Sequence, residues 1–341
     1  MDSIWTPPPH WLRIKTIDAH TGGEPLRIIT EGFPSLRGNT ILEKRRYMQK
    51  NYDFLRKALI WEPRGHPDMY GCLVTEPETQ DGAMGAIFLH NEGYSTMCGH
   101  GIIALSSVAW RTGLVRKEGS GPVLKIDTPA GQVTAVSRRK GTRGAVSFMN
   151  VPSYVCALDR KVNVPGIGTI SCDVAFGGAF YAFCRAEDLG LRIVTEEHDK
   201  LIDLGRRIKR AVSETLPIRH PFKKELGFLY GTIFTAAPAD KLHHSRNVCV
   251  FADGEIDRSP TGTGVSARLA IHHARGEISI DETIVVESII GTCFSGRIAG
   301  AERFGPHEAV VPEITGTAFI TGRHEFLLDP DDPLKHGFFL R

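Results

Sequence analysis

The sequence predicts an α+β protein built from two α/β domains of related architecture. Three observations support this prediction: a length of 341 residues, short runs that alternate apolar and polar positions, and one strand–turn–helix unit that occurs twice. The length is sufficient for two separate cores. A hydrophobic content of 41% and a charged content of 23% are typical of an ordinary globular protein.

Short alternating runs are the first signal, because a period of two places one face of a strand against a core. After Glu196 the apolar residues recur instead with the spacing of an amphipathic helix, at Leu201, Leu204, Ile208 and Val212. The predicted strands are LRIIT (26–30), AIFLH (86–90), AVSFMNV (145–151) and TIVVES (283–288).

An internal repeat appears when the stretch after Cys98 is aligned with the stretch after Thr261. Each copy follows a strand-like run, opens on a glycine-rich turn, continues as an apolar helix pattern and ends in a glycine where a helix C-cap belongs. The aligned pairs are Gly99 with Gly262, Gly101 with Gly264, Ala104 with Ala267 and Gly113 with Gly276. This order indicates a duplicated unit, so two central helices would point their N-termini into one cleft.

Charge and apolar patterning exclude several kinds of partner. The formal charge is +2 and no basic cluster alternates with aromatic residues, so we expect neither nucleic acid nor an anionic membrane surface as a partner. No apolar run is long enough to span a membrane, and the start MDSIWTPPPHW lacks the apolar core of a secretory signal. We therefore expect a cytoplasmic protein.

The seven cysteines are scattered, and no two are spaced as C-x-x-C, which indicates reduced thiols. Cys184, Cys249 and Cys293 lie in strand-like runs and are expected to be small buried hydrophobes. Cys98 differs because it lies at the predicted start of a helix, where N–H groups stabilise a thiolate and lower its pKa from about 8.5. The residues alone leave open whether Cys98 is a reactive thiolate or a free cysteine that caps a buried helix.

The second turn, DRSPTGTG (257–264), offers a complementary set of groups. Gly262, Thr263 and Gly264 would present backbone N–H groups to a carboxylate. Asp257 has two interpretations: a turn residue before Ser-Pro, or a carboxylate beside the cleft that holds a substrate ammonium. The stretch lacks the lysine of a phosphate loop, so nucleotide binding is not expected.

Other chemistry near Cys98 has little support. His100 is two residues away and would not face Cys98 on a helix, so no cysteine-protease dyad is predicted. One C-x-H supplies too few ligands for zinc. The pairs His243–His244 and His272–His273 are more typical of surface or helix-face residues than of a metal site.

At these residues the chain resembles the proline racemase family, which includes hydroxyproline 2-epimerases and trans-3-hydroxy-L-proline dehydratases. The likeness covers nearly the whole chain and is carried by DAHTGGEPLRI (18–28), EPRGHPDMYG (62–71), MCGHG (97–101) and DRSPTGTG (257–264). It implies the fold shared with diaminopimelate epimerase, in which two pseudo-symmetric domains each wrap β-strands around a central helix.

The resemblance also implies an organisation of the chain and its partners. An N-terminal domain would span residues 1–151, with about residues 324–341 returning to it, and a C-terminal domain would span residues 152–323, with the active site in the cleft between them. No cofactor and no metal are implied. The expected partner is a small imino-acid substrate, and a homodimer is common in the family.

Carried over residue by residue, the likeness places Cys98 at one of the two catalytic cysteines of the racemases and epimerases, and Thr261 at the other. In those enzymes one cysteine removes the α-proton and the second returns a proton from the opposite face. The matched substrate contacts are Gly99, His100, Gly262 and Thr263 at the carboxylate, Asp257 with His100 at the ring nitrogen, and Tyr70 and Phe251 beside the ring.

The threonine changes the expected reaction. A hydroxyl is far less acidic than a thiol, so Cys98 would be the single base, and the carbanion would need a leaving group on the adjacent carbon. In trans-3-hydroxy-L-proline that hydroxyl lies on the same face as the α-proton. We therefore expect cofactor-independent dehydration to Δ1-pyrroline-2-carboxylate, with Cys98 abstracting the α-proton. The alternatives are a weakly active proline racemase or hydroxyproline 2-epimerase, and a non-catalytic relative that binds an imino acid.

Overall fold

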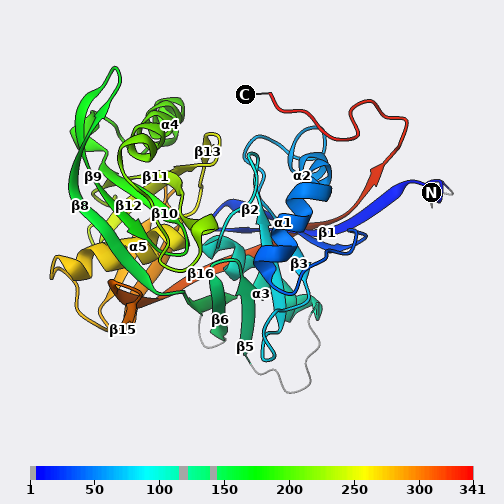
Figure 1. Cartoon of the computed structure of the whole chain (residues 1–341), viewed down its shortest axis with the longest axis horizontal. Coiled ribbons are helices and arrows are strands. Elements are labelled where there is room, and N and C mark those ends of the chain that lie inside the picture. The colour runs from blue at the N-terminus through cyan, green and yellow to red at the C-terminus, as the bar shows by residue number, and fades with distance from the viewer. Residues whose placement is uncertain (1–4, 115–121, 139–143, 341) are drawn as a thin grey trace.

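The strands of this protein form one continuous sheet that closes on itself twice (Figure 1). The computed structural model describes residues 5–114, 122–138 and 144–340. The first ring closes because β1 pairs with both β2 and β16. Its strands, in spatial order, are β1 (Leu12–Thr21), β2 (Glu24–Glu31), β3 (Gly71–Thr75), β4 (Met84–Leu89), β5 (Val123–Thr128), β6 (Gly131–Arg138), β7 (Ala145–Met149) and β16 (His307–Leu328).

The second ring closes through a pairing between β8 and the same long strand β16. A short strand, β13 (Glu255–Ile256), pairs with β12 at its edge. From β16 onward, the spatial order is β15 (Cys293–Phe304), β14 (Thr283–Glu287), β12 (Ser245–Phe251), β11 (Leu229–Ala236), β10 (Phe180–Arg185), β9 (Gly168–Phe176) and β8 (Ser153–Val164). The four strand runs predicted from alternation correspond to β2, β4, β7 and β14.

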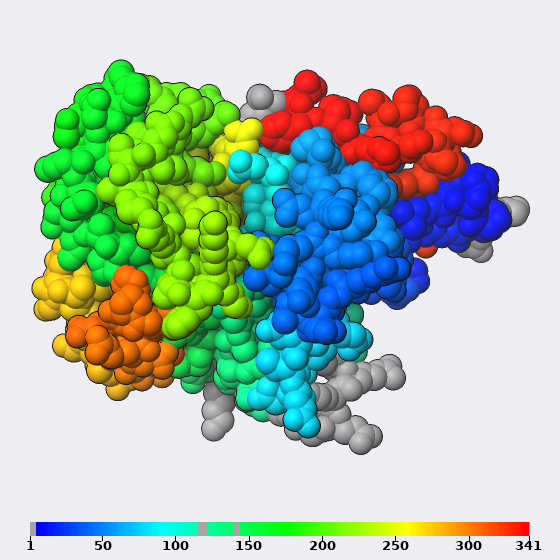
Figure 2. All heavy atoms as spheres, viewed as in Figure 1, coloured from blue at the N-terminus to red at the C-terminus, as the bar shows by residue number. Residues whose placement is uncertain are grey.

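Strand β16 belongs to both rings. Its first part, His307–Thr315, pairs with β15; Glu313–Thr317 pair with β7; and Ala318–Leu328 pair with β1. The chain therefore returns to the first ring at Glu313, and the expected boundary at residue 323 falls inside one uninterrupted strand. The strand runs without interruption from His307 to Leu328, so no break in the element marks the transfer. Figure 2 shows the residues that follow β16 (red) lying against the first half of the chain (blue).

One helix packs against the strands of each ring. α3 (Gly99–Thr112) contacts β1, β2, β6, β7 and β16, and α5 (Gly262–Ala274) contacts β8, β9, β15 and β16. The first eleven residues of α3 and the first ten of α5 are all buried. The prediction of two apolar central helices is confirmed. Gly113 and Gly276, the last aligned pair of the repeat, both adopt left-handed backbone with φ of 69° and 70°.

Three further helices lie outside this pair. α4 (His198–Thr215) is the predicted amphipathic helix and packs on β8, β11 and β12. α1 (Ile41–Asn51) and α2 (Asp53–Ile60) were not predicted. α1 begins with a capping box in which Thr40 and Glu43 bind each other's backbone N–H groups, and this T-x-x-E spacing is the signal that would have revealed it.

The two central helices meet end to end at a pair of glycines. A Cβ atom on Gly99 would lie 2.7 Å from the Cα of Gly262, and one on Gly262 would lie 2.9 Å from the Cα of Gly99. Both distances are shorter than a side-chain carbon tolerates against backbone. Glycine at these two positions therefore lets the N-termini of α3 and α5 converge.

We expect Gly99→Ala to lower the free energy of unfolding by about 2 kcal/mol, because the added methyl group must push one helix terminus from the other. The measurement is chemical denaturation of the variant beside the parent protein. Gly93→Ala is the matched control, because a Cβ there meets no atom within 4 Å. Equal losses in the two variants would contradict the tight approach of α3 and α5.

Candidate active site

A small cavity lies where the N-termini of α3 and α5 meet, with roughly 270 Å³ of space that protein atoms do not fill. The structure brings every predicted site residue to this cavity. They are Cys98, Gly99, His100, Asp257, Thr261, Gly262 and Thr263, together with the predicted ring neighbours Tyr70 and Phe251. The remaining lining residues are Met97, Tyr181, Tyr230 and Cys249, which the sequence analysis did not assign to a site.

Cys98 is the N-cap residue of α3. Its backbone is extended, with φ of −143° and ψ of 113°, and its Sγ accepts a hydrogen bond from the Gly101 N–H at 3.3 Å. The extended backbone turns the thiol toward His100, whose Nδ1 lies 3.2 Å from Sγ. The expectation that these two side chains do not face each other was wrong, because Cys98 precedes the helix instead of belonging to it.

The thiol of Cys98 is buried, and burial raises its pKa well above the usual value. The nearby Asp257 carboxylate adds to the rise, while hydrogen bonds from the Gly101 N–H and the Tyr70 hydroxyl lower the pKa. In the substrate-free protein, the prediction of a lowered pKa for Cys98 at a helix N-terminus was therefore wrong. Loss of hydration raises the pKa of the thiol more than the helix N–H groups lower it. Burial also lowers the pKa of His100, which favours its neutral form.

Thr261 lies opposite, at the N-cap position of α5, and its hydroxyl does not cap the helix. Instead, its Oγ1 donates to Oδ2 of Asp257 at 2.8 Å. Thr261 adopts a φ of 64°, which directs the side chain away from the helix N–H groups. A β-branched residue is strained in this region. The hydrogen bond to Asp257 helps hold Thr261 in this strained conformation.

Asp257 is fixed from two directions. Its Oδ1 accepts from the Ser259 N–H at 2.7 Å, and its Oδ2 accepts from Thr261. Its own N–H donates to the carbonyl oxygen of Cys249. Asp257 is buried and lines the cavity, so its carboxylate is held in place at the edge of the space between the two helices.

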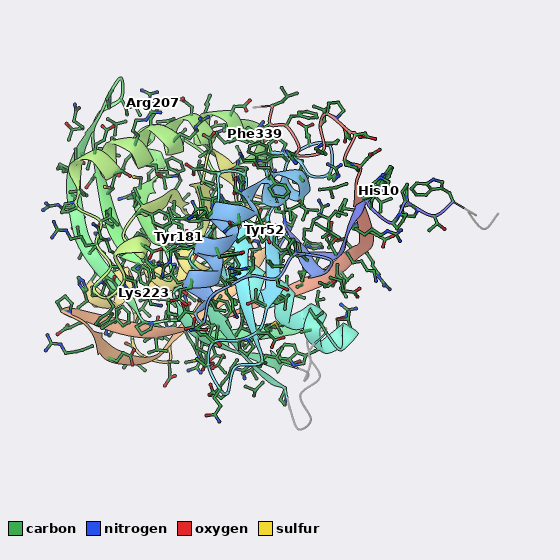
Figure 3. The ribbon with its side chains drawn as sticks, turned by 45° about the vertical axis from the view of Figure 1, so that its right-hand side comes forward. His10, Tyr52, Tyr181, Arg207, Lys223 and Phe339 are labelled. Atoms are coloured by element: carbon green, nitrogen blue, oxygen red, sulfur yellow. The ribbon has the colours of Figure 1, made fainter. Side chains whose placement is uncertain are left out.

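The helix termini supply N–H groups at the other end of the cavity, because the first N–H groups of a helix have no partner within it. Gly99 and His100 open α3, while Gly262 and Thr263 open α5. The Thr263 hydroxyl lies 2.6 Å from the hydroxyl of Tyr181, which is labelled in Figure 3. Two helix N-termini directed at one point form a site suited to an anion.

Glu24 is a buried carboxyl group next to the site, and it was not predicted from the sequence. Its Oε2 accepts from the Arg258 N–H at 2.7 Å. Burial and the neighbouring Asp257 charge raise the pKa of Glu24 well above its usual value. The signal was an acidic residue directly after Thr-Gly-Gly in an otherwise apolar strand pattern. No comparable signal distinguishes Tyr181, Tyr230 or Cys249 from ordinary strand residues.

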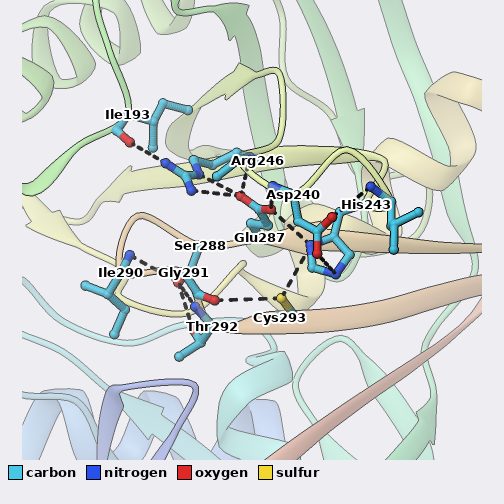
Figure 4. A network of polar contacts seen from close by, with 12 residues as sticks. Ile193, Asp240, His243, Arg246, Glu287, Ser288, Ile290, Gly291, Thr292 and Cys293 are labelled. Carbon is cyan, nitrogen blue, oxygen red and sulfur yellow. Dashed lines mark hydrogen bonds and ion pairs between the residues drawn. The ribbon is translucent and has the colours of Figure 1, made fainter.

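The other predicted cysteine environments differ from one another. Cys184 and Cys249 are buried as expected, but Cys293 is exposed. Cys293 is the first residue of β15, and its Sγ lies 4.0 Å from Nδ1 of His243 in a polar network around Glu287 (Figure 4).

The polar network around Glu287 also connects the second half of the chain to the first. Within it, the Thr292 hydroxyl donates to the carbonyl oxygen of Gly22 at 2.7 Å.

Within residues 5–114, 122–138 and 144–340, no three His, Cys, Asp or Glu side chains lie close enough to hold a metal ion together. None of the helices in that part of the chain combines the length and the apolar character needed to cross a lipid bilayer.

Known proteins resemble this chain over nearly its full length. A family model described as "Proline racemase" matches residues 16–339. The trans-3-hydroxy-L-proline dehydratase of Colwellia psychrerythraea is 50% identical over 332 residues, covering 97% of this chain and 94% of that protein. The 3-hydroxyproline 2-epimerase of Burkholderia multivorans is 42% identical over 329 residues, covering 96% of this chain and 98% of that protein.

A solved structure agrees with these sequence matches. The crystal structure of a hydroxyproline epimerase from Agrobacterium vitis, with bound trans-4-hydroxy-L-proline, has a TM-score of 0.91 at 29% identity and covers 98% of this chain and 96% of that chain. Together with the matched residues 16–339, this agreement assigns the closed double sheet to the proline racemase fold. The chain belongs to the proline racemase family.

Proposed function

We propose that this chain dehydrates trans-3-hydroxy-L-proline to Δ1-pyrroline-2-carboxylate, without a cofactor. The observation that carries the proposal is that the Cys98 thiol, at the N-cap of α3, and the Thr261 hydroxyl, at the N-cap of α5, line one cavity. Full-length relatives with the name trans-3-hydroxy-L-proline dehydratase support it.

The cavity offers complementary groups to each end of an imino acid. The substrate carboxylate would accept hydrogen bonds from the N–H groups that open α3 and α5, at Gly99, His100, Gly262 and Thr263. The ring ammonium would bind Asp257, which Ser259 and Thr261 hold in position. These two anchors would place the α-carbon between Cys98 and Thr261.

Cys98 would act as the base. Its thiolate removes the α-proton, and the helix N–H groups stabilise the negative charge that develops on the carboxylate, an effect worth roughly 3 kcal/mol per donor. The substrate ammonium would also bring a positive charge close to the buried thiol. This charge offsets part of the cost of burial, so the thiolate forms more readily in the complex than in the protein alone.

Thr261 would supply no second proton. Its hydroxyl is far less acidic than a thiol, and it already donates to Asp257. With no proton from Thr261, the carbanion would be resolved by loss of the hydroxyl on C3, which lies on the same face as the α-proton. The resulting enamine tautomerises to the cyclic imine.

The second candidate is a 3-hydroxyproline 2-epimerase, which the Burkholderia multivorans relative favours by its name. Epimerisation requires a proton donor on the Thr261 face. A dehydratase yields an imine, whereas an epimerase yields the diastereomer of its substrate. Incubation with 3-hydroxyproline and with proline, followed by chiral chromatography and imine detection, separates the two reactions.

We also propose two pseudo-symmetric domains of the kind shared with diaminopimelate epimerase, near residues 1–151 and 152–323, with the final residues returning to the first. The two rings of strands, each with one central helix, support this division. The aligned glycines of the repeat support it independently. In this division, the cavity at Gly99 and Gly262 lies between the domains.

We expect Cys98→Ser to lower kcat for dehydration by about 1,000-fold, because a serine hydroxyl does not ionise near neutral pH. Imine formation measures the rate, and chemical denaturation verifies that the variant folds. The control is Cys293→Ser, which removes an exposed thiol that does not line the cavity and should leave the rate unchanged. Full activity in Cys98→Ser would refute the mechanism.

The raised pKa of Cys98 predicts that kcat/KM increases with pH from about 7 to 9, because the base must lose its proton before substrate binds. The corresponding rise in kcat should lie at lower pH, because bound substrate places its ammonium beside the thiol. Steady-state rates across this range test both statements. A kcat/KM that falls with pH over this interval would show that the thiolate is not the base.

Position 261 provides a third test. Thr261→Ser keeps the hydroxyl that binds Asp257 and should retain much of the dehydratase rate. Thr261→Cys places a thiol opposite Cys98, so we expect a gain of α-proton exchange with inversion on L-proline, which has no 3-hydroxyl to expel. Deuterium incorporation in heavy water, read with chirality, measures the gain. Inversion of proline by the parent protein as fast as dehydration would contradict the one-base mechanism.

A further inference from the structure

Two tyrosine hydroxyls in the cavity have no role in binding the carboxylate or the ammonium. Tyr70 and Tyr230 are both buried, and their hydroxyl oxygens lie 3.3 Å apart. Tyr70 precedes β3 in the first ring, and Tyr230 belongs to β11 in the second. The two hydroxyls therefore meet across the junction of the rings, inside the cavity lining.

The pair lies on the Cys98 side of the cavity. The Tyr70 hydroxyl lowers the pKa of the Cys98 thiol, and both residues line the cavity. The Tyr70 ring also packs edge-on against the ring of His100, with centroids 4.8 Å apart. The Tyr230 ring stacks on Phe251 at 5.4 Å, which fixes the second hydroxyl.

The other side-chain hydroxyls of the cavity already have partners. Tyr181 and Thr263 bind each other near the helix termini, and Thr261 binds Asp257. A substrate anchored at its carboxylate and its ammonium has one polar group left, the hydroxyl on C3. In trans-3-hydroxy-L-proline this group points to the same face as the α-proton, which is the face of Cys98 and Tyr70.

We propose that the paired hydroxyls of Tyr70 and Tyr230 bind the 3-hydroxyl of the substrate, and that Tyr70 passes it the proton with which it leaves. The proposal rests on the dehydratase function proposed above. It makes Tyr70 a catalytic residue and Tyr230 a residue that selects substrates with a hydroxyl at C3.

Protons and electron pairs are conserved in this step. The Cys98 thiolate takes the α-proton, and the electron pair of the C–H bond forms the C2=C3 double bond as the C3–O bond breaks. Tyr70 donates its proton to the departing oxygen, which leaves as water, and regains a proton from the Cys98 thiol. Cys98 is then a thiolate again. Burial raises the pKa of both tyrosines, so both are proton donors at neutral pH.

The test uses phenylalanine variants and the natural substrate in heavy water. Tyr70→Phe should lower kcat for dehydration about 100-fold and Tyr230→Phe about tenfold, because each loses a donor to the leaving hydroxyl. In both variants, deuterium incorporation at C2 of the unreacted substrate should rise relative to product formation. Proton removal at Cys98 continues while departure of the hydroxyl slows.

Tyr181→Phe is the matched control, because it removes the same atom from the same cavity at the carboxylate end. There, deuterium incorporation and dehydration should fall together. The proposal is overturned if Tyr70→Phe and Tyr230→Phe dehydrate at the parent rate, or if both reactions fall in proportion as in Tyr181→Phe. A parent protein that forms no imine would instead refute the dehydratase function itself.

Discussion

The contact between Gly99 and Gly262 is the constraint on which the site depends. Two helices whose N-termini are separated by side chains would present their N–H groups to different points in space. With glycine on both sides, the termini approach until a single Cβ would collide with backbone. Their N–H groups and their partial positive charges then act on the same anion. The rest of the cavity is arranged around this point.

The balance of charge in the cavity follows from burial. Asp257 is a buried carboxylate in the cavity lining, and hydrogen bonds from Ser259 and Thr261 hold it. Its neighbour Glu24 is also fully buried, and burial together with the Asp257 charge raises the pKa of Glu24. Burial likewise raises the pKa of the Cys98 thiol and favours its protonated form. Burial therefore limits the negative charge of the cavity.

Much of this arrangement could be predicted from the residues, because glycine positions and apolar periodicity reflect local rules. The repeat around Cys98 and Thr261 indicated two central helices with convergent N-termini, and all seven predicted site residues line one cavity. The direction of the Thr261 hydroxyl could not be predicted, because a positive φ at a β-branched residue contradicts local preference. The tyrosine pair was also missed, since residues far apart in sequence meet only when the rings come together. The pKa of Cys98 was misjudged because burial is a property of the whole fold.

The sharing of β16 has a consequence for how the chain is made. Strand β1 begins at Leu12, and its partner in β16 ends at Leu328, so the first ring joins segments that are far apart in the sequence. During synthesis, β1 to β7 emerge early but remain an open sheet with two unpaired edges until residues 313–328 have left the ribosome. Exposed edges of this kind invite pairing with other chains. The second ring also depends on β16, so neither ring can close before residues 307–328 have been synthesised.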